Sequence, residues 1–162
     1  MNIISIKEPD EFQVRQMHKI NQENTPEVGD VPELIEFQNL IALSEYIVIA
    51  QDKADLVGFM LCMKEGNSYK SKNYLYLSGS YPKFLYVDRI AIQKDYRRQG
   101  LGRNIYKQVI ESAESLRIPL LCEVNIKPRN IASLAFHRNL GFKEFGNNDF
   151  ESYSVVYLKK DP

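Results

Sequence analysis

The feature that most constrains this sequence is an apolar strand that leads through a basic, glycine-containing turn into a long amphipathic helix. Residues Phe84–Ile92 are mostly apolar, which favours a buried strand. From Leu101 onward, apolar residues recur every three or four positions, the spacing of one buried helix face. These residues are Ile105, Val109, Ala113 and Leu116. The polar run Gln93–Gly102 connects the two elements, so a sheet with a helix packed against it is expected.

The remaining apolar patterns place antiparallel hairpins early in the chain and strand–helix units late. This order predicts a mixed α/β sheet and not a doubly wound nucleotide fold. The predicted strands are Met1–Lys7, Tyr46–Ala50, Leu56–Lys64, Phe84–Ile92, Pro119–Asn125, Phe142–Phe145 and Tyr153–Leu158, and the predicted helices are Phe12–Ile20, Pro32–Ala42, Leu101–Leu116 and Asn130–Asn139.

The segment Glu65–Pro82 is polar and rich in tyrosine, and we expect it to form a long loop. Tyrosine provides rigid amphipathic contact area at binding surfaces. Tyr74 and Tyr81 are therefore candidate substrate contacts, with a dimer contact or an ordinary surface loop as alternatives.

Composition and charge exclude several classes of protein. The chain has 162 residues, of which 44% are hydrophobic and 26% charged, the balance of one globular domain. Its 21 Lys and Arg residues balance 21 Asp and Glu residues, so no nucleic-acid partner is expected. No run approaches the roughly 18 apolar residues of a membrane span. Met1–Pro9 lacks the apolar core of a secretion signal, so no membrane partner is expected.

The two cysteines, Cys62 and Cys122, lie within separate apolar runs. Buried reduced thiols fit this pattern better than a disulfide, which predicts a cytoplasmic protein. The cysteines and the two histidines have no close spacing, so no metal site is expected.

The turn before the long helix predicts an anion site. Gly100 and Gly102 carry no side chain that would obstruct an anion at the helix N-terminus, where backbone N–H groups and the helix dipole attract negative charge. Several basic residues flank these glycines, opposed only by Asp95. They are Lys94, Arg97, Arg98 and Arg103. The site would suit a pyrophosphate, and the alternative is a solvated basic loop.

A second motif runs from Asn130 through Phe136 and His137 to Gly141-Phe142. With the R-x-x-G-x-G turn upstream, it resembles the GNAT superfamily of acetyl-CoA-dependent N-acetyltransferases, chiefly over residues 84–145. The Val-Asp-Arg-Ile and Cys-Glu-Val-Asn strands resemble, more loosely, a bacterial branch of that superfamily. The resemblance implies a single domain over residues 1–162. It also implies the GNAT fold, a mixed, mostly antiparallel sheet of six to seven strands flanked by about four helices.

The resemblance further implies acetyl-CoA as the cofactor. Loop amides from Arg98 to Arg103 would hold the pyrophosphate, and the strand end would bind the pantetheine arm where two strands splay apart. The implied cofactor-binding residues are Ile90, Ala91, Ile92, Arg97, Arg98, Gln99, Gly100, Leu101, Gly102, Arg103, Asn130, Ser133, Phe136 and His137.

Three charged residues in predicted strands are candidates for chemistry. Glu123 interrupts an apolar strand, where a carboxylate needs a partner or a use. It resembles the general-base glutamate of ribosomal-protein-alanine N-acetyltransferases, and the alternative is an outward-facing residue. Asp88 and Arg89 are adjacent, so strand alternation predicts that they face opposite sides of the sheet. Asp88 is the second candidate base and Arg89 a candidate substrate contact. A structural ion pair is the alternative for both.

His137 occupies the position that is usually tyrosine in the family, where the hydroxyl is the proposed acid for the departing thiolate. Histidine can donate a proton near neutral pH, so His137 is a candidate acid or base. The alternative is a residue that only lines the cofactor.

These observations predict an N-acetyltransferase that moves an acetyl group from acetyl-CoA to a primary amine. The amine could belong to a small molecule, an amino acid or a protein N-terminus. The resemblance also implies a homodimer through the last strands. The alternative function is a coenzyme A-binding regulatory module without turnover.

Overall fold

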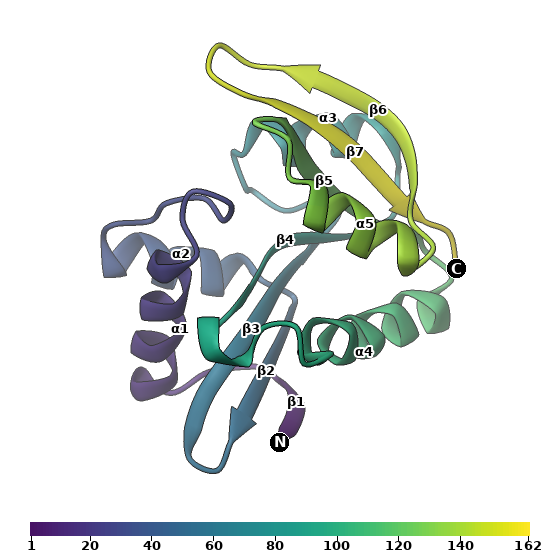
Figure 1. Cartoon of the computed structure of the whole chain (residues 1–162). Helices are drawn as coiled ribbons and strands as arrows, with labels where there is room; N and C mark the ends of the chain where they lie inside the picture. The colour runs from purple at the N-terminus through teal and green to yellow at the C-terminus, as the bar shows by residue number, and fades with distance from the viewer.

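The computed structural model describes all residues from Met1 to Pro162, and its centre is one seven-stranded sheet with helices on both faces (Figure 1). The strands lie in the order β1-β2-β3-β4-β5-β7-β6. The strands are β1 (Asn2–Ile6), β2 (Tyr46–Asp52), β3 (Asp55–Lys64), β4 (Leu85–Ile92), β5 (Leu120–Lys127), β6 (Lys143–Asp149) and β7 (Ser154–Lys160), and the helices are α1 (Glu11–Glu23), α2 (Leu34–Leu43), α3 (Lys72–Ser80), α4 (Leu101–Leu116) and α5 (Ile131–Asn139).

Local sequence signals account for the helix that follows β4. Ile105, Val109 and Ala113 of α4 form one buried stripe, as their spacing predicts, whereas Leu116 at the end of the helix is 45% exposed. Gly100 precedes the helix with a φ of 79°, in the left-handed region that glycine adopts without strain. A short 3₁₀ turn, Lys94–Tyr96, leads into this segment. The sequence pattern therefore fixes the position where α4 begins.

No helix of the chain is both long and apolar enough to span a bilayer.

The sheet is antiparallel except where β4 meets β5. These two strands run parallel and pair only at Leu85–Leu120 and Tyr86–Leu121. Beyond Tyr86 the strands diverge, so the rest of β4 has no hydrogen-bonding neighbour on that side. The sheet therefore has two parts, which are joined by a short contact (Figure 1). One part consists of β1, β2, β3 and β4, and the other consists of β5, β7 and β6. The mixed, mostly antiparallel sheet confirms the predicted fold class.

A β-bulge in β4 lies at the point of divergence. Leu61 on β3 pairs with Arg89 and Cys62 pairs with Val87, which leaves Asp88 as the extra residue. Val87 and Ile90 pack in the same core cluster, so their side chains lie on the same face of the sheet. Residues three apart in a regular strand face opposite sides, so the bulge has shifted the alternation of side chains by one residue. The prediction that Asp88 and Arg89 face opposite sides is therefore wrong. Both side chains point to the face away from α4.

Each face of the sheet has its own core. On one face, α4 and α5 pack over the cluster that includes Cys62, Val87 and Cys122. The opposite face carries two clusters, one beneath α1 and α2 and another that contains Tyr86 and Leu121 beneath α3. Cys62 and Cys122 are buried free thiols, as predicted.

The segment Glu65–Pro82 contains a helix, α3, so the prediction of a long loop is wrong there. Ser71 caps α3 by accepting a hydrogen bond from the Tyr74 amide at 3.4 Å. Tyr74 itself is 1% exposed, and its hydroxyl donates to the Lys64 carbonyl at 2.6 Å and accepts from the Asn67 amide at 2.9 Å. Contacts between buried aromatic residues stabilise this helix, and its own sequence has little helical periodicity to reveal it.

Replacing Tyr74 with phenylalanine tests how α3 is attached. The substitution leaves a buried carbonyl and a buried amide without their partner, which costs about 1–3 kcal/mol of unfolding free energy. Urea denaturation measures the loss. Tyr153→Phe makes the same chemical change at a residue that is 36% exposed, and it should shift the free energy by less than about 0.5 kcal/mol. Equal effects of the two substitutions would show that the Tyr74 hydroxyl does not anchor the segment.

Candidate active site

The turn before α4 presents backbone donors to solvent. The first hydrogen bond of this helix joins the Asn104 amide to the Gly100 carbonyl at 3.1 Å. The amides of residues 101–103 therefore have no acceptor within the helix, and the helix dipole places partial positive charge beside them. A side chain at Gly100 would meet nothing within 4 Å, so the approach to these amides is open. This is the geometry of an anion site, as the sequence predicts.

The basic side chains of this turn divide into two kinds. Arg97 is fixed, because its Nε donates to the Ile92 carbonyl at 3.1 Å and its Nη2 donates to Asn24 Oδ1 at 2.8 Å. Arg98 and Arg103 are exposed and form no ion pair within the chain. Arg97 thus holds the turn against β4 and α1, whereas Arg98 and Arg103 are available to an anion.

Helix α5 lies beside the start of α4. A Cβ at Gly102 would lie 3.4 Å from the Phe136 ring and 3.5 Å from Ile92 Cδ1, so glycine permits this close packing. Asn130 caps α5, with its Oδ1 accepting from the Ser133 amide at 3.1 Å. The structure therefore brings Ile90 and Ile92 of β4 together with the predicted cofactor residues of α4 and α5 on one face of the sheet, whereas the Ala91 side chain packs on the opposite face.

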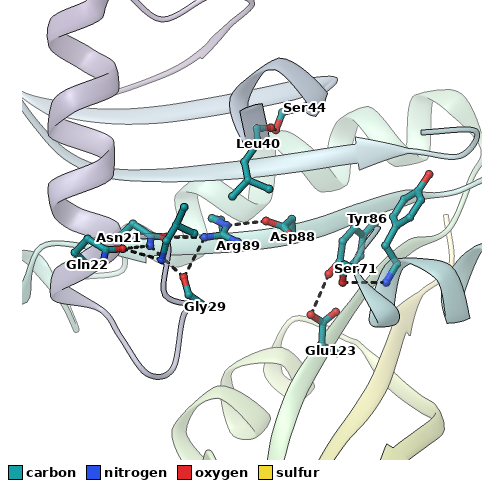
Figure 2. A network of polar contacts seen from close by, with 12 residues as sticks. Asn21, Gln22, Gly29, Leu40, Ser44, Ser71, Tyr86, Asp88, Arg89 and Glu123 are labelled. Atoms are coloured by element: carbon teal, nitrogen blue, oxygen red, sulfur yellow. Dashed lines mark hydrogen bonds and ion pairs between the residues drawn. The ribbon is translucent and has the colours of Figure 1, made fainter. Parts of the chain in front are cut away.

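Glu123 projects from β5 toward the opposite face. Its Oε1 accepts a hydrogen bond from the fully buried Tyr86 hydroxyl at 3.0 Å, across the gap between β5 and β4 (Figure 2). Its Oε2 is buried and has no hydrogen-bond partner. The alternative of an outward-facing Glu123 is wrong, since its Oε2 is buried and its Oε1 is bonded to Tyr86, although the residue as a whole is half-buried.

Burial raises the pKa of Glu123 to about 8, and the nearby Asp88 carboxylate contributes to the increase. The hydrogen bond from Tyr86 and the neighbouring Asn73 amide act in the opposite direction. Near neutral pH this carboxyl group therefore exchanges a proton readily. A titratable group with this pKa and an unpartnered oxygen is suited to general acid–base chemistry.

Asp88 and Arg89 form the structural ion pair that the sequence left open as an alternative. Arg89 Nε lies 2.6 Å from Asp88 Oδ2, and the two side chains are 7% and 4% exposed respectively. Arg89 Nη1 also donates to Asn21 Oδ1 at 2.9 Å and to the Gly29 carbonyl at 3.2 Å (Figure 2). Arg89 thus already bonds to three protein groups, which leaves it little capacity to bind a substrate.

His137 is 5% exposed and lies between α5 and α4. Its Nδ1 contacts the Ser133 carbonyl at 2.8 Å, so Nδ1 carries the hydrogen, and Nε2 then accepts from the Tyr106 hydroxyl at 2.7 Å. Burial lowers the pKa of His137, which keeps the ring neutral. The structure therefore does not support His137 as the acid, because both ring nitrogens already bond to protein groups.

Two predicted substrate contacts also occupy structural positions. Tyr74 lies in the core under α3 and has no free surface for a substrate. Tyr81 packs edge-on against Phe145, with ring centroids 5.5 Å apart, near the outer strand of the sheet. The sequence did not reveal the residues that do surround Glu123, namely Tyr86 and Asn73, because only the folded sheet places them there.

Comparison with known proteins identifies the family. A sequence profile of the acetyltransferase (GNAT) family matches residues 14–142, which is most of the chain. The chain therefore belongs to the GNAT family, which confirms the resemblance seen in its sequence.

Individual proteins either match only part of this chain or share few identical residues with it. The [ribosomal protein bS18]-alanine N-acetyltransferase of Escherichia coli is 36% identical over 55 residues, which span 34% of this chain and 36% of that protein. The match thus spans about a third of the length of the curated relative. The crystal structure of the ribosomal-protein-S18-alanine N-acetyltransferase from Escherichia coli aligns with a TM-score of 0.72 at 17% identity, over 99% of this chain and 92% of that one. An aminoglycoside 6'-N-acetyltransferase complexed with coenzyme A aligns with a TM-score of 0.73 at 13% identity, over 99% and 97% of the two chains. These structures share the fold.

The raised pKa of Glu123 predicts a pH-dependent stability. Below about pH 4.5 the carboxyl group is protonated in both the folded and the unfolded chain, so its burial adds no ionisation penalty. As the pH rises toward about 8, the unfolded chain ionises first, and the folded state loses stability on the order of 4 kcal/mol. Glu123→Gln removes this loss. Denaturant titrations at about pH 5 and about pH 9 should therefore show a smaller decrease for the variant than for the wild type.

Glu144→Gln is the matched control, because it makes the same change at an exposed position on β6. It should follow the wild type at both pH values. If Glu123→Gln also follows the wild type, the carboxyl group is ionised in the folded protein without penalty, and its assignment as a perturbed group is wrong.

Proposed function

We propose that this chain is an N-acetyltransferase that transfers an acetyl group from acetyl-CoA to a primary amine, with residues 1–162 as one GNAT domain. The observation that carries the proposal is the buried, unpartnered Oε2 of Glu123 beside the gap between β4 and β5. A buried carboxylate oxygen without a donor is costly unless a ligand supplies one, and an ammonium group is a suitable donor. The family match supports the same reaction.

Residues on the α4 face fit the donor. The three free amides at the start of α4, the open position at Gly100 and the exposed Arg98 and Arg103 suit a pyrophosphate. Ile90–Ile92 of β4 has no strand partner on the β5 side, so backbone groups there are offered to an extended arm, except for the Ile92 carbonyl, which accepts from Arg97 and Asn24. When bound there, acetyl-CoA supplies the activated acetyl group. One relative of this fold is described as complexed with coenzyme A, which supports the assignment.

Glu123 accepts the proton of the acceptor ammonium, directly or through water, so that the neutral amine becomes the nucleophile. Asp88 is the weaker candidate for this role, because Arg89 already neutralises it at 2.6 Å. The Tyr86 hydroxyl holds Glu123 in place by its hydrogen bond to Oε1. We assign His137 a positioning role, in which its bond to Tyr106 fixes α5 against α4.

A second function is favoured by one observation. His137 is fully bonded where the family usually has a tyrosine, so the proton donor to the thiolate is lacking at that position. A coenzyme A-binding regulatory module without turnover would tolerate this arrangement. Release of the coenzyme A thiol that depends on added amine distinguishes the enzyme from the module.

The remaining attributes belong to the proposal as well. The two buried free thiols support a cytoplasmic location. The resemblance to the family supports a homodimer through the last strands. The named relatives act on a ribosomal protein or on aminoglycosides, so both macromolecular and small amines are represented among them.

Gly100→Glu tests the donor site. The substitution places a carboxylate beside the free amides at the start of α4, so calorimetry should show acetyl-CoA binding to the wild type and a loss of about 100-fold or more in the variant. Lys107→Gln on the exposed side of α4 changes the net charge by the same amount and should bind normally. Absence of binding by the wild type would contradict the assigned donor site.

Glu123→Gln tests the base. Loss of general-base catalysis should reduce kcat about 100-fold or more, while the affinity for acetyl-CoA stays unchanged. Because the base must be ionised, wild-type kcat/KM should show an inflection near pH 8, and the variant should lose this inflection and keep only the rise caused by deprotonation of the acceptor amine. Thiol-release kinetics measure both effects, with Glu144→Gln as the control. A variant that retains the wild-type rate and pH profile would exclude Glu123 as the base.

A further inference from the structure

Helix α3 joins the two parts of the split sheet on the face where Glu123 lies. On one side, Tyr74 of α3 bonds to the Lys64 carbonyl of β3 and packs 5.7 Å from the Tyr86 ring of β4. On the other side, Tyr76 stacks on Tyr157 of β7 with ring centroids 4.1 Å apart. The helix therefore crosses the gap between β4 and β5 and is anchored at both of its edges.

The contact between α3 and the outer strands is close and continuous. The Tyr157 hydroxyl donates to Asn73 Oδ1 at 2.9 Å, and a Cβ at Gly146 on β6 would lie 2.6 Å from the Tyr76 oxygen. Glycine at position 146 thus permits Tyr76 to sit directly on β6. At the start of α3, Lys72 Nζ lies 5.7 Å from the centre of the Phe150 ring. Along these contacts the side chains of α3 lie directly on the β6–β7 hairpin.

The first turn of α3 covers the charged groups. Asn73 lies next to Glu123 and lowers its pKa, and because Asn73 Oδ1 accepts from Tyr157, its NH₂ group is the end that faces the carboxylate. Tyr69, just before α3, lies beside Asp88, whose carboxylate raises the pKa of the tyrosine together with burial. The carboxylate of Glu123 is therefore enclosed by amide and phenol groups.

Apart from Glu123, the charged side chains buried in this enclosure form one ion pair. Asp88 and Arg89 neutralise each other, and the Nε and Nη1 of Arg89 are bonded to Asp88, Asn21 and Gly29. A substrate carboxylate would thus meet no buried cation that lacks a counter-ion, so its burial there would be unfavourable. A single ammonium group, in contrast, finds the unpartnered Oε2 of Glu123.

We propose that the acceptor is a compact primary amine without a carboxylate, an alkylamine or arylalkylamine, and that α3 excludes amino acids and polypeptide N-termini. This inference rests on the proposed acetyl transfer and specifies its substrate class. Tyr76 is then a specificity-determining residue, since its stacking on Tyr157 closes the enclosure on the side of β7.

Matched acceptors test the proposal. Phenethylamine and phenylalanine differ only by the carboxylate, butylamine and norvaline differ in the same way, and the tripeptide Phe-Gly-Gly extends the first pair to a chain. With purified full-length chain and acetyl-CoA, kcat/KM for at least one of the two amines should exceed that of its carboxylate partner and of the tripeptide by more than about tenfold. An equal or reversed order would overturn the substrate class, as would acetylation of the carboxylate-bearing acceptors alone.

A variant tests the role of α3 itself. Tyr76→Ala removes the stacking on Tyr157 and the contact above Gly146, so it should raise the ratio of kcat/KM for Phe-Gly-Gly to kcat/KM for phenethylamine about fivefold or more. Leu75→Ala, at a neighbouring residue that is 53% exposed, should leave this ratio unchanged. An unchanged preference in Tyr76→Ala would overturn exclusion by α3.

The outcomes separate this inference from the proposed function. Calorimetric binding of acetyl-CoA together with amine-dependent thiol release on any of the five acceptors supports the acetyltransferase, whichever acceptor is preferred. Lack of acetyl-CoA binding, or binding without thiol release on any acceptor, overturns the acetyltransferase and the substrate class together.

Discussion

The separation of β4 from β5 is the constraint on which the rest of this structure depends. A central sheet normally buries its strand edges by pairing them, yet here two parallel strands pair at only two positions before they diverge. Other elements must therefore cover the open edges. Helices α4 and α5 do so on one face, and α3 with the α1–α2 connection does so on the other. The result is a split sheet whose two faces carry different chemistry beside the split.

The charged groups differ between the two faces of the split sheet. On the α4 face, partial positive charge comes from backbone amides and the helix dipole, so it does not titrate. On the α3 face, the bulge at Asp88 turns Asp88 and Arg89 to the same side, where they neutralise each other. Glu123 then remains as the single unpaired acid, and burial brings its pKa close to neutrality. The bulge thus determines which of two neighbouring carboxylates is available for proton transfer.

The sequence predicted features that depend on local periodicity or on glycine. The stripe of α4, the turn at Gly100 and the free thiols follow directly from the order of residues. Prediction from the sequence failed where contacts between residues far apart in the chain determine the structure. Helix α3 depends on aromatic contacts with β4 and β7, and a bulge leaves no mark on an apolar strand pattern. For His137, the partner that occupies Nε2 is Tyr106, on another helix, so spacing within α5 could not reveal it.

The features that the sequence predicted and those that it did not predict belong to different halves of the proposed reaction. Binding of the donor relies on backbone groups at a glycine turn, and such a site is recognisable because few residue types allow its geometry. Recognition of the acceptor relies on side chains from β4, β5, β7 and α3 that meet only in the folded protein, such as Tyr86 with Glu123 and Asn73 with Tyr157. A family that shares the donor turn can therefore change its acceptor by exchanging the segment between β3 and β4. In this chain that segment is a helix anchored on both sides of the gap, and this anchoring argues for a small acceptor even though one relative acts on a ribosomal protein.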